Sequence, residues 1–233
     1  MIGDRDVGFD CAGLVSWRSK TMHILDEKEL QEKALPAWRR VFTAENNNIY
    51  SSPFTPEVES RAIVYPAHDD LEDFISVETL VNAAAKVGDQ GIYIFAPWDG
   101  NFVGGSKCYV PLAEFIDGYT YGGNKEKSIY YQLGANVHNK CVSFLSSNGA
   151  WGIMMDLDHV GIIGGSLEFM AEIRKGTPNL DQQVYQFLAE LEYLVADGYK
   201  RAINEWLPEL LTHVYGKKKA KIMTEITGCE YTI

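Results

Sequence analysis

The densest group of chemically capable side chains is the run Asp156-Leu157-Asp158-His159. Two carboxylates and an imidazole within four residues could hold a divalent metal ion, or place a general base beside a carboxylate. The same residue types are common in hairpin turns, because Asp side chains bond to nearby backbone amides and tolerate unusual dihedral angles. A plain turn is the favoured interpretation. A metal-assisted hydrolase or other enzyme that uses Asp156, Asp158 and His159 is the alternative.

The other motifs that could carry chemistry are incomplete. His68-Asp69-Asp70 is not accompanied by HExxH, EF-hand or paired-cysteine spacing, which favours a solvated loop. Gly164-Gly165-Ser166 lies between an expected strand and an expected helix, where backbone amides can hold an anion, but it lacks the phosphate-loop lysine and the GxGxxG spacing. There is no GxSxG motif, and Cys141 has no orienting acid near it. We therefore assign no catalytic residue, no metal site and no cofactor.

The overall composition is that of a folded, acidic protein. The chain has 233 residues, of which 46% are hydrophobic and 23% are charged, enough to bury a core. The formal net charge is −11, so we expect no nucleic-acid partner and favour basic partners. The lysine run 217–221 follows an expected helix end, where positive charge complements the helix dipole.

No segment indicates export or membrane insertion. No run approaches the roughly 18 apolar residues that span a bilayer. The N-terminus lacks the basic start and apolar stretch of a secretion signal. The four cysteines are widely separated and form no CxxC pair, so reduced thiols are expected. We expect a cytoplasmic protein with no membrane partner.

Helices are predicted before residue 90. Asp26 starts a capping box, and the apolar spacing that follows predicts a helix that Pro36 interrupts. Ser76 is the expected cap of a second helix, which runs from about Val77 to Val87 and ends at Gly88.

Short apolar runs separated by turn residues then predict strands. These runs are 92–95, 129–133, 142–145, 151–155 and 160–163. Asn148-Gly149 between two of them is a strong hairpin signal, because both residues tolerate positive φ angles. A meandering antiparallel sheet is therefore expected between residues 91 and 166.

The C-terminal part is predicted to be helical. Ser166 caps a short helix, and Asn179 begins a longer one whose apolar stripe continues to Val214. Gly198 and Pro208 are expected to bend or divide it, and Gly216 to stop it. The alternating segment 222–227 predicts an edge strand.

These elements predict one α+β domain over residues 1–233. It would consist of an N-terminal helical part (1–90), a central antiparallel meander sheet (91–166) and long C-terminal helices (167–216).

Aromatic and acidic residues are interspersed around the first part of the expected sheet. Tyr and Trp beside carboxylates suit a protein-binding face that accepts basic side chains. The candidate partner-binding residues are Trp98, Asp99, Tyr119 and Tyr121, together with Asp156, Asp158 and His159 of the turn.

One segment resembles part of a known class of proteins. The hairpin Ser146-Ser147-Asn148-Gly149-Ala150-Trp151-Gly152-Ile153-Met154, the run 159–166 and the helix start Leu167-Glu168-Phe169 resemble a segment of small bacterial cytosolic immunity proteins. Such proteins neutralise secreted or contact-delivered toxins and share no catalytic residues, so no residue role is transferred. The resemblance implies an acidic, stoichiometric inhibitor that docks onto a cognate toxin.

The leading hypothesis from the sequence is therefore a cytosolic protein-binding inhibitor, of the immunity type, with a basic protein toxin as its partner. The enzyme alternative depends on Asp156, Asp158 and His159. A third possibility is an assembly component that uses the long C-terminal helix as an oligomer face, for which its apolar stripe would have to stay exposed.

Overall fold

The structure is a computed structural model of the chain. It describes residues 23–43, 49–50, 52–66, 71, 74–98, 101–120, 141–156 and 160–231, without the side chains of 97–98, 101–106, 120 and 141. Within this part of the chain, the centre is a seven-stranded sheet in the order β1-β4-β3-β5-β6-β7-β2, and every neighbouring pair is antiparallel. The strands are β1 (His23–Ile24), β2 (Ser60–Val64), β3 (Gly91–Trp98), β4 (Asn101–Pro111), β5 (Cys141–Ser146), β6 (Trp151–Asp156) and β7 (Gly161–Gly165).

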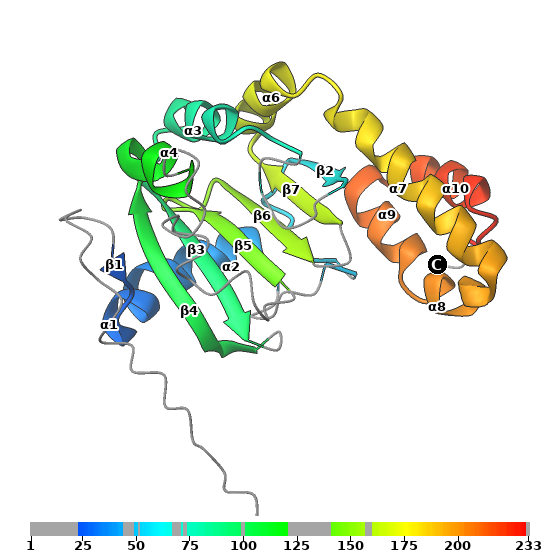
Figure 1. The fold of residues 1–233 in the computed structure, drawn as a ribbon, viewed down its shortest axis with the longest axis horizontal. Coiled ribbons are helices and arrows are strands. Elements are labelled where there is room, and N and C mark those ends of the chain that lie inside the picture. Colours follow the sequence, from blue (N-terminus) through cyan, green and yellow to red (C-terminus); the bar gives the residue numbers. More distant parts are fainter. Residues whose placement is uncertain are drawn as a thin grey trace, which may run out of the picture.

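Helices surround this sheet on both faces and at one edge (Figure 1). The helices α3 (Val77–Lys86), α4 (Leu112–Thr120) and α6 (Leu167–Gly176) lie along one face. A segment made of α1 (Glu27–Glu29), the π-helical η2 (Leu30–Ala34) and α2 (Leu35–Val41) packs against the opposite face. The expected α+β class, with an antiparallel sheet between N-terminal and C-terminal helices, is confirmed.

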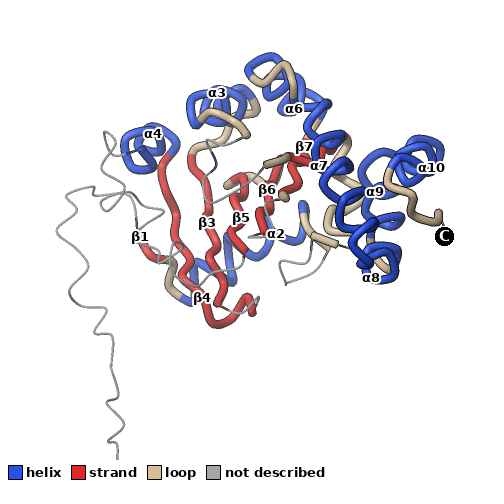
Figure 2. The backbone as a smooth tube through the Cα atoms, turned by 45° about the vertical axis from the view of Figure 1, so that its right-hand side comes forward, coloured by secondary structure: helices blue, strands red, loops and turns tan. Residues whose placement is uncertain are grey.

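Five further helical segments stand beside β2 at the edge of the sheet, as the turned view in Figure 2 also shows. They are α7 (Leu180–Leu194), the π-helical η6 (Val195–Tyr199), α8 (Lys200–Asn204), α9 (Leu207–Tyr215) and α10 (Lys217–Ile226). The predicted division is confirmed, because Gly198 has φ 105° inside η6, Pro208 lies in the first turn of α9, and Gly216 at φ 78° follows its end.

Both faces of the sheet are buried, which explains the near-continuous apolar runs of its strands. On β3, Ile92 and Ile94 belong to the apolar cluster that includes α3, α4 and α6, whereas Tyr93 and Phe95 belong to the cluster on the opposite face, where Phe95 contacts Trp38 of α2. Because successive side chains of a strand point to opposite faces, a sheet covered on both sides needs apolar residues at every position.

The predicted helix starts at Asp26, Ser76 and Ser166 are confirmed by their hydrogen bonds, whereas Asn179 precedes α7 without a side-chain cap. The side chains of Asp26, Ser76 and Ser166 accept from the backbone amides three residues later, at 2.8, 3.1 and 3.2 Å. Pro36 lies in the first turn of α2, directly after η2. The helix therefore changes from π-helical to α-helical winding next to the residue that has no backbone N–H to donate.

Two of the predicted strands, at residues 222–227 and 129–133, are not confirmed. The edge strand expected at residues 222–227 is wrong, because α10 continues through Ile226. Its buried residues Ala220, Met223 and Thr224 recur at spacings of three and four, which is helical periodicity. The expected strand at 129–133 lies outside the described residues.

The hairpin predicted at Asn148-Gly149 is confirmed between β5 and β6, and a buried carboxylate holds it in place. Asp89, which follows α3 and is 4% exposed, accepts hydrogen bonds from Ser147 Oγ (3.0 Å), Asn148 N (3.1 Å) and Trp151 Nε1 (2.6 Å). Ser146 Oγ lies 2.9 and 2.8 Å from its two carboxylate oxygens. Burial raises the pKa of Asp89, and these hydrogen bonds oppose that shift.

The C-terminal helices supply acceptors for the outer edge of β2. Ile63 N donates to Tyr215 Oη at 3.0 Å, and Tyr65 N donates to Gln183 Oε1 at 3.1 Å. These two amides point away from β7, the only strand that pairs with β2 within the described residues. Side chains from α9 and α7 therefore take the place of a further strand.

A second set of contacts joins α9 to the segment before β2. His213 Nε2 accepts from Phe54 N at 3.0 Å, and its ring stacks on Phe54 with centroids 6.2 Å apart. Arg61 donates to the carbonyls of His213 (2.6 Å) and Thr55 (3.0 Å). Burial, with a contribution from the charge of Arg61, lowers the pKa of His213 from 6.5 to about 4. A neutral imidazole is required, because a protonated Nε2 cannot accept from Phe54.

The Asp89 contacts predict a stability effect. In Asp89→Asn, one carboxylate oxygen is replaced by an NH₂ group that cannot accept a hydrogen bond. Either Trp151 Nε1 or the amide and hydroxyl donors of the turn then lose their acceptor. The free energy of unfolding is expected to fall by about 1–3 kcal/mol, measured by urea denaturation. Asp197→Asn, at an exposed position, is the control and should change it by less than about 0.5 kcal/mol. Equal stability of the two variants would contradict the anchoring role of Asp89.

The His213 contacts predict a pH dependence. A depressed pKa in the folded state means that stability is present above the ordinary value of 6.5 and is lost as the pH falls towards about 4. His213→Gln keeps an acceptor near the Nε2 position but does not titrate. Between about pH 7.5 and about pH 4.5, the wild type should lose about 1–2 kcal/mol more stability than this variant, measured by urea denaturation. Parallel losses in both proteins would show that His213 does not titrate on unfolding.

Candidate functional site

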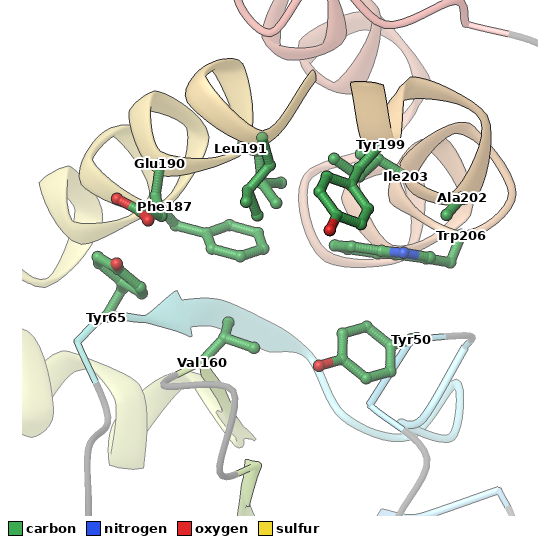
Figure 3. A pocket seen from close by; sticks show the side chains of 11 residues that line it. Tyr50, Tyr65, Val160, Phe187, Glu190, Leu191, Tyr199, Ala202, Ile203 and Trp206 are labelled. Carbon is green, nitrogen blue, oxygen red and sulfur yellow. The ribbon is translucent and has the colours of Figure 1, made fainter. Parts of the chain in front are cut away.

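An aromatic-lined cavity lies between the C-terminal helices and the end of the sheet next to β2 (Figure 3). Its volume is about 520 Å³. This is within the range of cavities that bind small molecules or large side chains. Its walls are mostly aromatic and aliphatic: Tyr50, Tyr65, Val160, Phe187, Glu190, Leu191, Leu194, Tyr199, Ala202, Ile203 and Trp206.

One wall is the face of α7 that carries Phe187, Leu191 and Leu194. These residues are spaced by four and three, so they lie on one face of the helix. The positive φ of Gly198 then turns the chain, and Tyr199 and Trp206 come to lie across from α7 (Figure 3). Glycine suits this turn because a side chain would be strained at φ 105°.

The opposite wall comes from the sheet. Tyr65 directly follows β2, and Val160 directly precedes β7. They are neighbours because the two strands pair with Val64 opposite Gly161. The hydrogen bond from Tyr65 N to Gln183 fixes this wall to α7.

Four aromatic rings form a continuous series around the cavity. Tyr65 and Phe187 have ring centroids 5.8 Å apart, Phe187 and Trp206 are 6.2 Å apart, and Trp206 and Tyr50 are 4.7 Å apart in an edge-to-face arrangement. These distances are typical of stabilising aromatic pairs. The rings come from four separate segments, so their contacts hold the cavity open in a defined shape.

The acidic group of the cavity is Glu190, an exposed residue of α7. Burial raises the pKa of Tyr65, and the negative charge of Glu190 raises it further, which places the two groups close to each other. Glu190 has no ion-pair partner among the residues that the structure describes. Lys200 and Arg201, which follow Tyr199 in the chain, pair with Glu230 at 3.6 Å and with Glu205 at 3.8 Å.

A smaller cavity of about 230 Å³ lies near β1, at the other edge of the sheet. It contains His23 and Lys33, and both contact Glu29, at 2.8 and 3.4 Å. Because the Glu29 carboxylate already contacts the Lys33 ammonium and a ring nitrogen of His23, this cavity offers less uncompensated charge than the one beside Glu190.

The residues predicted to bind a partner are only partly described. Trp98 lies at the end of β3, but its side chain is not among those described, and Asp99, Tyr121, Asp158 and His159 lie outside the described residues. Asp156 ends β6, half-buried, and its amide donates to Val160 O at 2.9 Å. The arrangement of Asp156, Asp158 and His159 is therefore not defined, and the segment 68–70 also lies outside the described residues.

Tyr119 is not available as a surface contact. It is 4% exposed, its ring stacks on Phe115 at 5.6 Å, and its hydroxyl accepts from Leu71 N at 3.0 Å. Its aromatic ring belongs to the core because α4 packs on the face of the sheet. A high density of aromatic residues in the sequence does not show which of them are buried and which are exposed.

The glycine pair before α6 serves packing. A Cβ on Gly164 would lie 2.9 Å from the ring of Phe54, and a Cβ on Gly165 would lie 2.7 Å from Trp151 Cβ. At the start of α6, the amide of Leu167 donates to the Glu59 carboxylate at 3.1 Å. A side chain of the protein itself thus takes the position that an anion would occupy.

Sequence patterns alone did not reveal the cavity. Phe187, Leu191 and Trp206 belong to the apolar stripe of the predicted C-terminal helices, and Tyr50 and Glu190 lie in no motif. The one available signal was that the stripe is broken by Gly198 and Pro208, which displaces Trp206 from a straight helix. Much of the stripe is buried within the chain itself, which argues against the exposed oligomer face considered above.

The described residues contain no assembled metal-binding group and no membrane-spanning helix. Among them, no group of three or more His, Cys, Asp or Glu residues is placed to hold a metal ion. None of their helices has the length and apolar character needed to cross a bilayer.

Comparison with known proteins identifies no relative. No family model, curated protein or solved structure matches this chain.

Proposed function

We propose that this protein is a protein-binding inhibitor, of the immunity type, and that it holds a basic partner protein at the aromatic cavity beside α7. The observation that carries the proposal is this cavity, with four aromatic rings and a carboxylate that has no ion-pair partner among the described residues.

The wall composition favours protein binding. Trp and Tyr are the residues most enriched at the energetic centres of protein interfaces, because they bury a large area at low cost in side-chain entropy. Tyr199 lines the cavity and is 58% exposed, and Trp206 is half-buried beside it. A partner side chain that enters the cavity would cover both rings.

The charge of the chain supports a basic partner. A net charge of −11 attracts a positively charged protein over long range and raises its association rate. Occlusion of the partner needs no catalytic group in this protein, in keeping with the class of inhibitor that the hairpin segment resembles.

The test has two parts. The neighbouring gene product in the source genome is the partner to examine first, because an immunity gene lies beside the gene for its toxin. Co-expression should restore growth of cells that make this product, and the two proteins should purify as a complex with a fixed stoichiometry. A neighbouring product that is harmless, or that does not bind, would contradict the proposal.

The cavity variant then locates the interface. Trp206→Ala removes the central ring and should weaken the complex at least about 30-fold, as expected for an interface residue worth about 2 kcal/mol or more, measured by calorimetric titration. Tyr193→Ala is the control, since Tyr193 is an aromatic residue of α7 that is 68% exposed and does not line the cavity. Thermal unfolding of both variants checks that they are folded. Equal affinities of the two variants would place the partner elsewhere.

A further inference from the structure

We infer that the group received by the cavity is the guanidinium of an arginine residue on the partner protein. This inference rests on the proposed function, but it concerns the chemistry of the cavity and can be tested without the partner.

The cavity places flat aromatic surfaces beside one carboxylate. Phe187 lies between Glu190 and Trp206, with Tyr65 next to Glu190 and Tyr50 next to Trp206 (Figure 3). A guanidinium is planar and weakly hydrated, so it can stack on an aromatic ring and still donate two parallel hydrogen bonds to a carboxylate. An ammonium group is compact and strongly hydrated, and it presents no flat face to the rings.

The charges near the cavity favour a cation. Glu190 has no ion-pair partner among the described residues, whereas Lys200 and Arg201, which follow Tyr199 in the chain, are each within 4 Å of another carboxylate. The cavity therefore carries uncompensated negative charge next to apolar walls. A cation would gain an ion pair with Glu190 that an uncharged apolar occupant cannot form, and an anion would be repelled.

The size of the cavity also fits a protein side chain. A volume of about 520 Å³ is more than a single cation needs, so there is room for the arginine side chain together with part of the chain that carries it. The mouth is formed by exposed residues, Tyr199 and Ala202, so a side chain from another protein can enter. This favours an arginine presented by a partner over a free ion enclosed by the protein.

The experiment titrates the full-length protein with the peptide acetyl-Gly-Arg-Gly-amide. The readout is the indole N–H resonance of Trp206 in a nitrogen–proton correlation spectrum, assigned from the spectrum of Trp206→Phe. We expect a saturable shift with weak, roughly millimolar affinity, as is usual for a single side chain. The same peptide with citrulline, which has the same shape but no charge, should bind at least about tenfold more weakly, as should the lysine peptide.

The variant Glu190→Gln should weaken binding of the arginine peptide about fivefold or more, because it removes the charge and keeps the shape. Glu192→Gln is the matched control: Glu192 is also exposed on α7 and does not line the cavity, so affinity should be unchanged. Both positions are exposed, so neither substitution should prevent folding.

Several results would overturn the inference. They are no shift at saturating peptide, equal binding of the citrulline or lysine peptide, an unchanged affinity in Glu190→Gln, or binding of free arginine at least about tenfold tighter than the peptide. If the arginine peptide does not bind but a partner protein is found, the inference fails and the proposed function stands. If the peptide binds and no partner is found, the arginine site stands and the proposed function fails.

Discussion

The architecture depends on how the outer edge of β2 finds its hydrogen-bond acceptors. A strand at the end of a sheet presents unpaired amides, and these would be costly to bury without partners and prone to pair with another chain if left open. Here the amides of Ile63 and Tyr65 are satisfied by Tyr215 and Gln183. This requirement fixes α7 and α9 against the edge, and the position of every later helix follows from it.

Helices at the edge of a sheet cover less of their apolar surface than helices on its face. A helix on the face of a sheet buries its apolar side against the strands along its length. A helix at the edge contacts the strand with part of its surface and leaves a gap beyond the strand end. Tyr65 lies where β2 ends, and the cavity begins there. The same contacts that close the sheet thus create the candidate site.

The sequence predicted local elements well and their assembly poorly. Helix starts depend on bonds within four residues, so Asp26, Ser76 and Ser166 could be identified from their neighbours alone, as could the hairpin at Asn148-Gly149. The prediction of an edge strand at 222–227 was wrong, because the apolar residues of so short a segment fit the periodicity of a strand and of a helix about equally well. Only the packing of Met223 decides between the two.

The contacts that define the site are of another kind, since they join residues more than a hundred positions apart. Tyr65 meets Gln183, Phe54 meets His213, and Tyr50 meets Trp206. No local pattern encodes such pairs. Asp89 was missed for the same reason, because its donors are contributed by a hairpin almost sixty residues later in the chain. The role of a buried carboxylate such as Asp89 can be recognised only when the donors around it in the folded structure are known.

The cavity walls come from four segments that are far apart in the chain. Any molecule that occupies the cavity therefore connects these segments to one another. A molecule in contact with both Trp206 and Tyr65 bridges the C-terminal helices and the sheet, so it would have to leave before the two could separate. Its binding energy would be added to the free energy that holds the helices against the edge. Occupancy would therefore protect the amides of β2 from hydrogen exchange, at positions that the ligand does not touch.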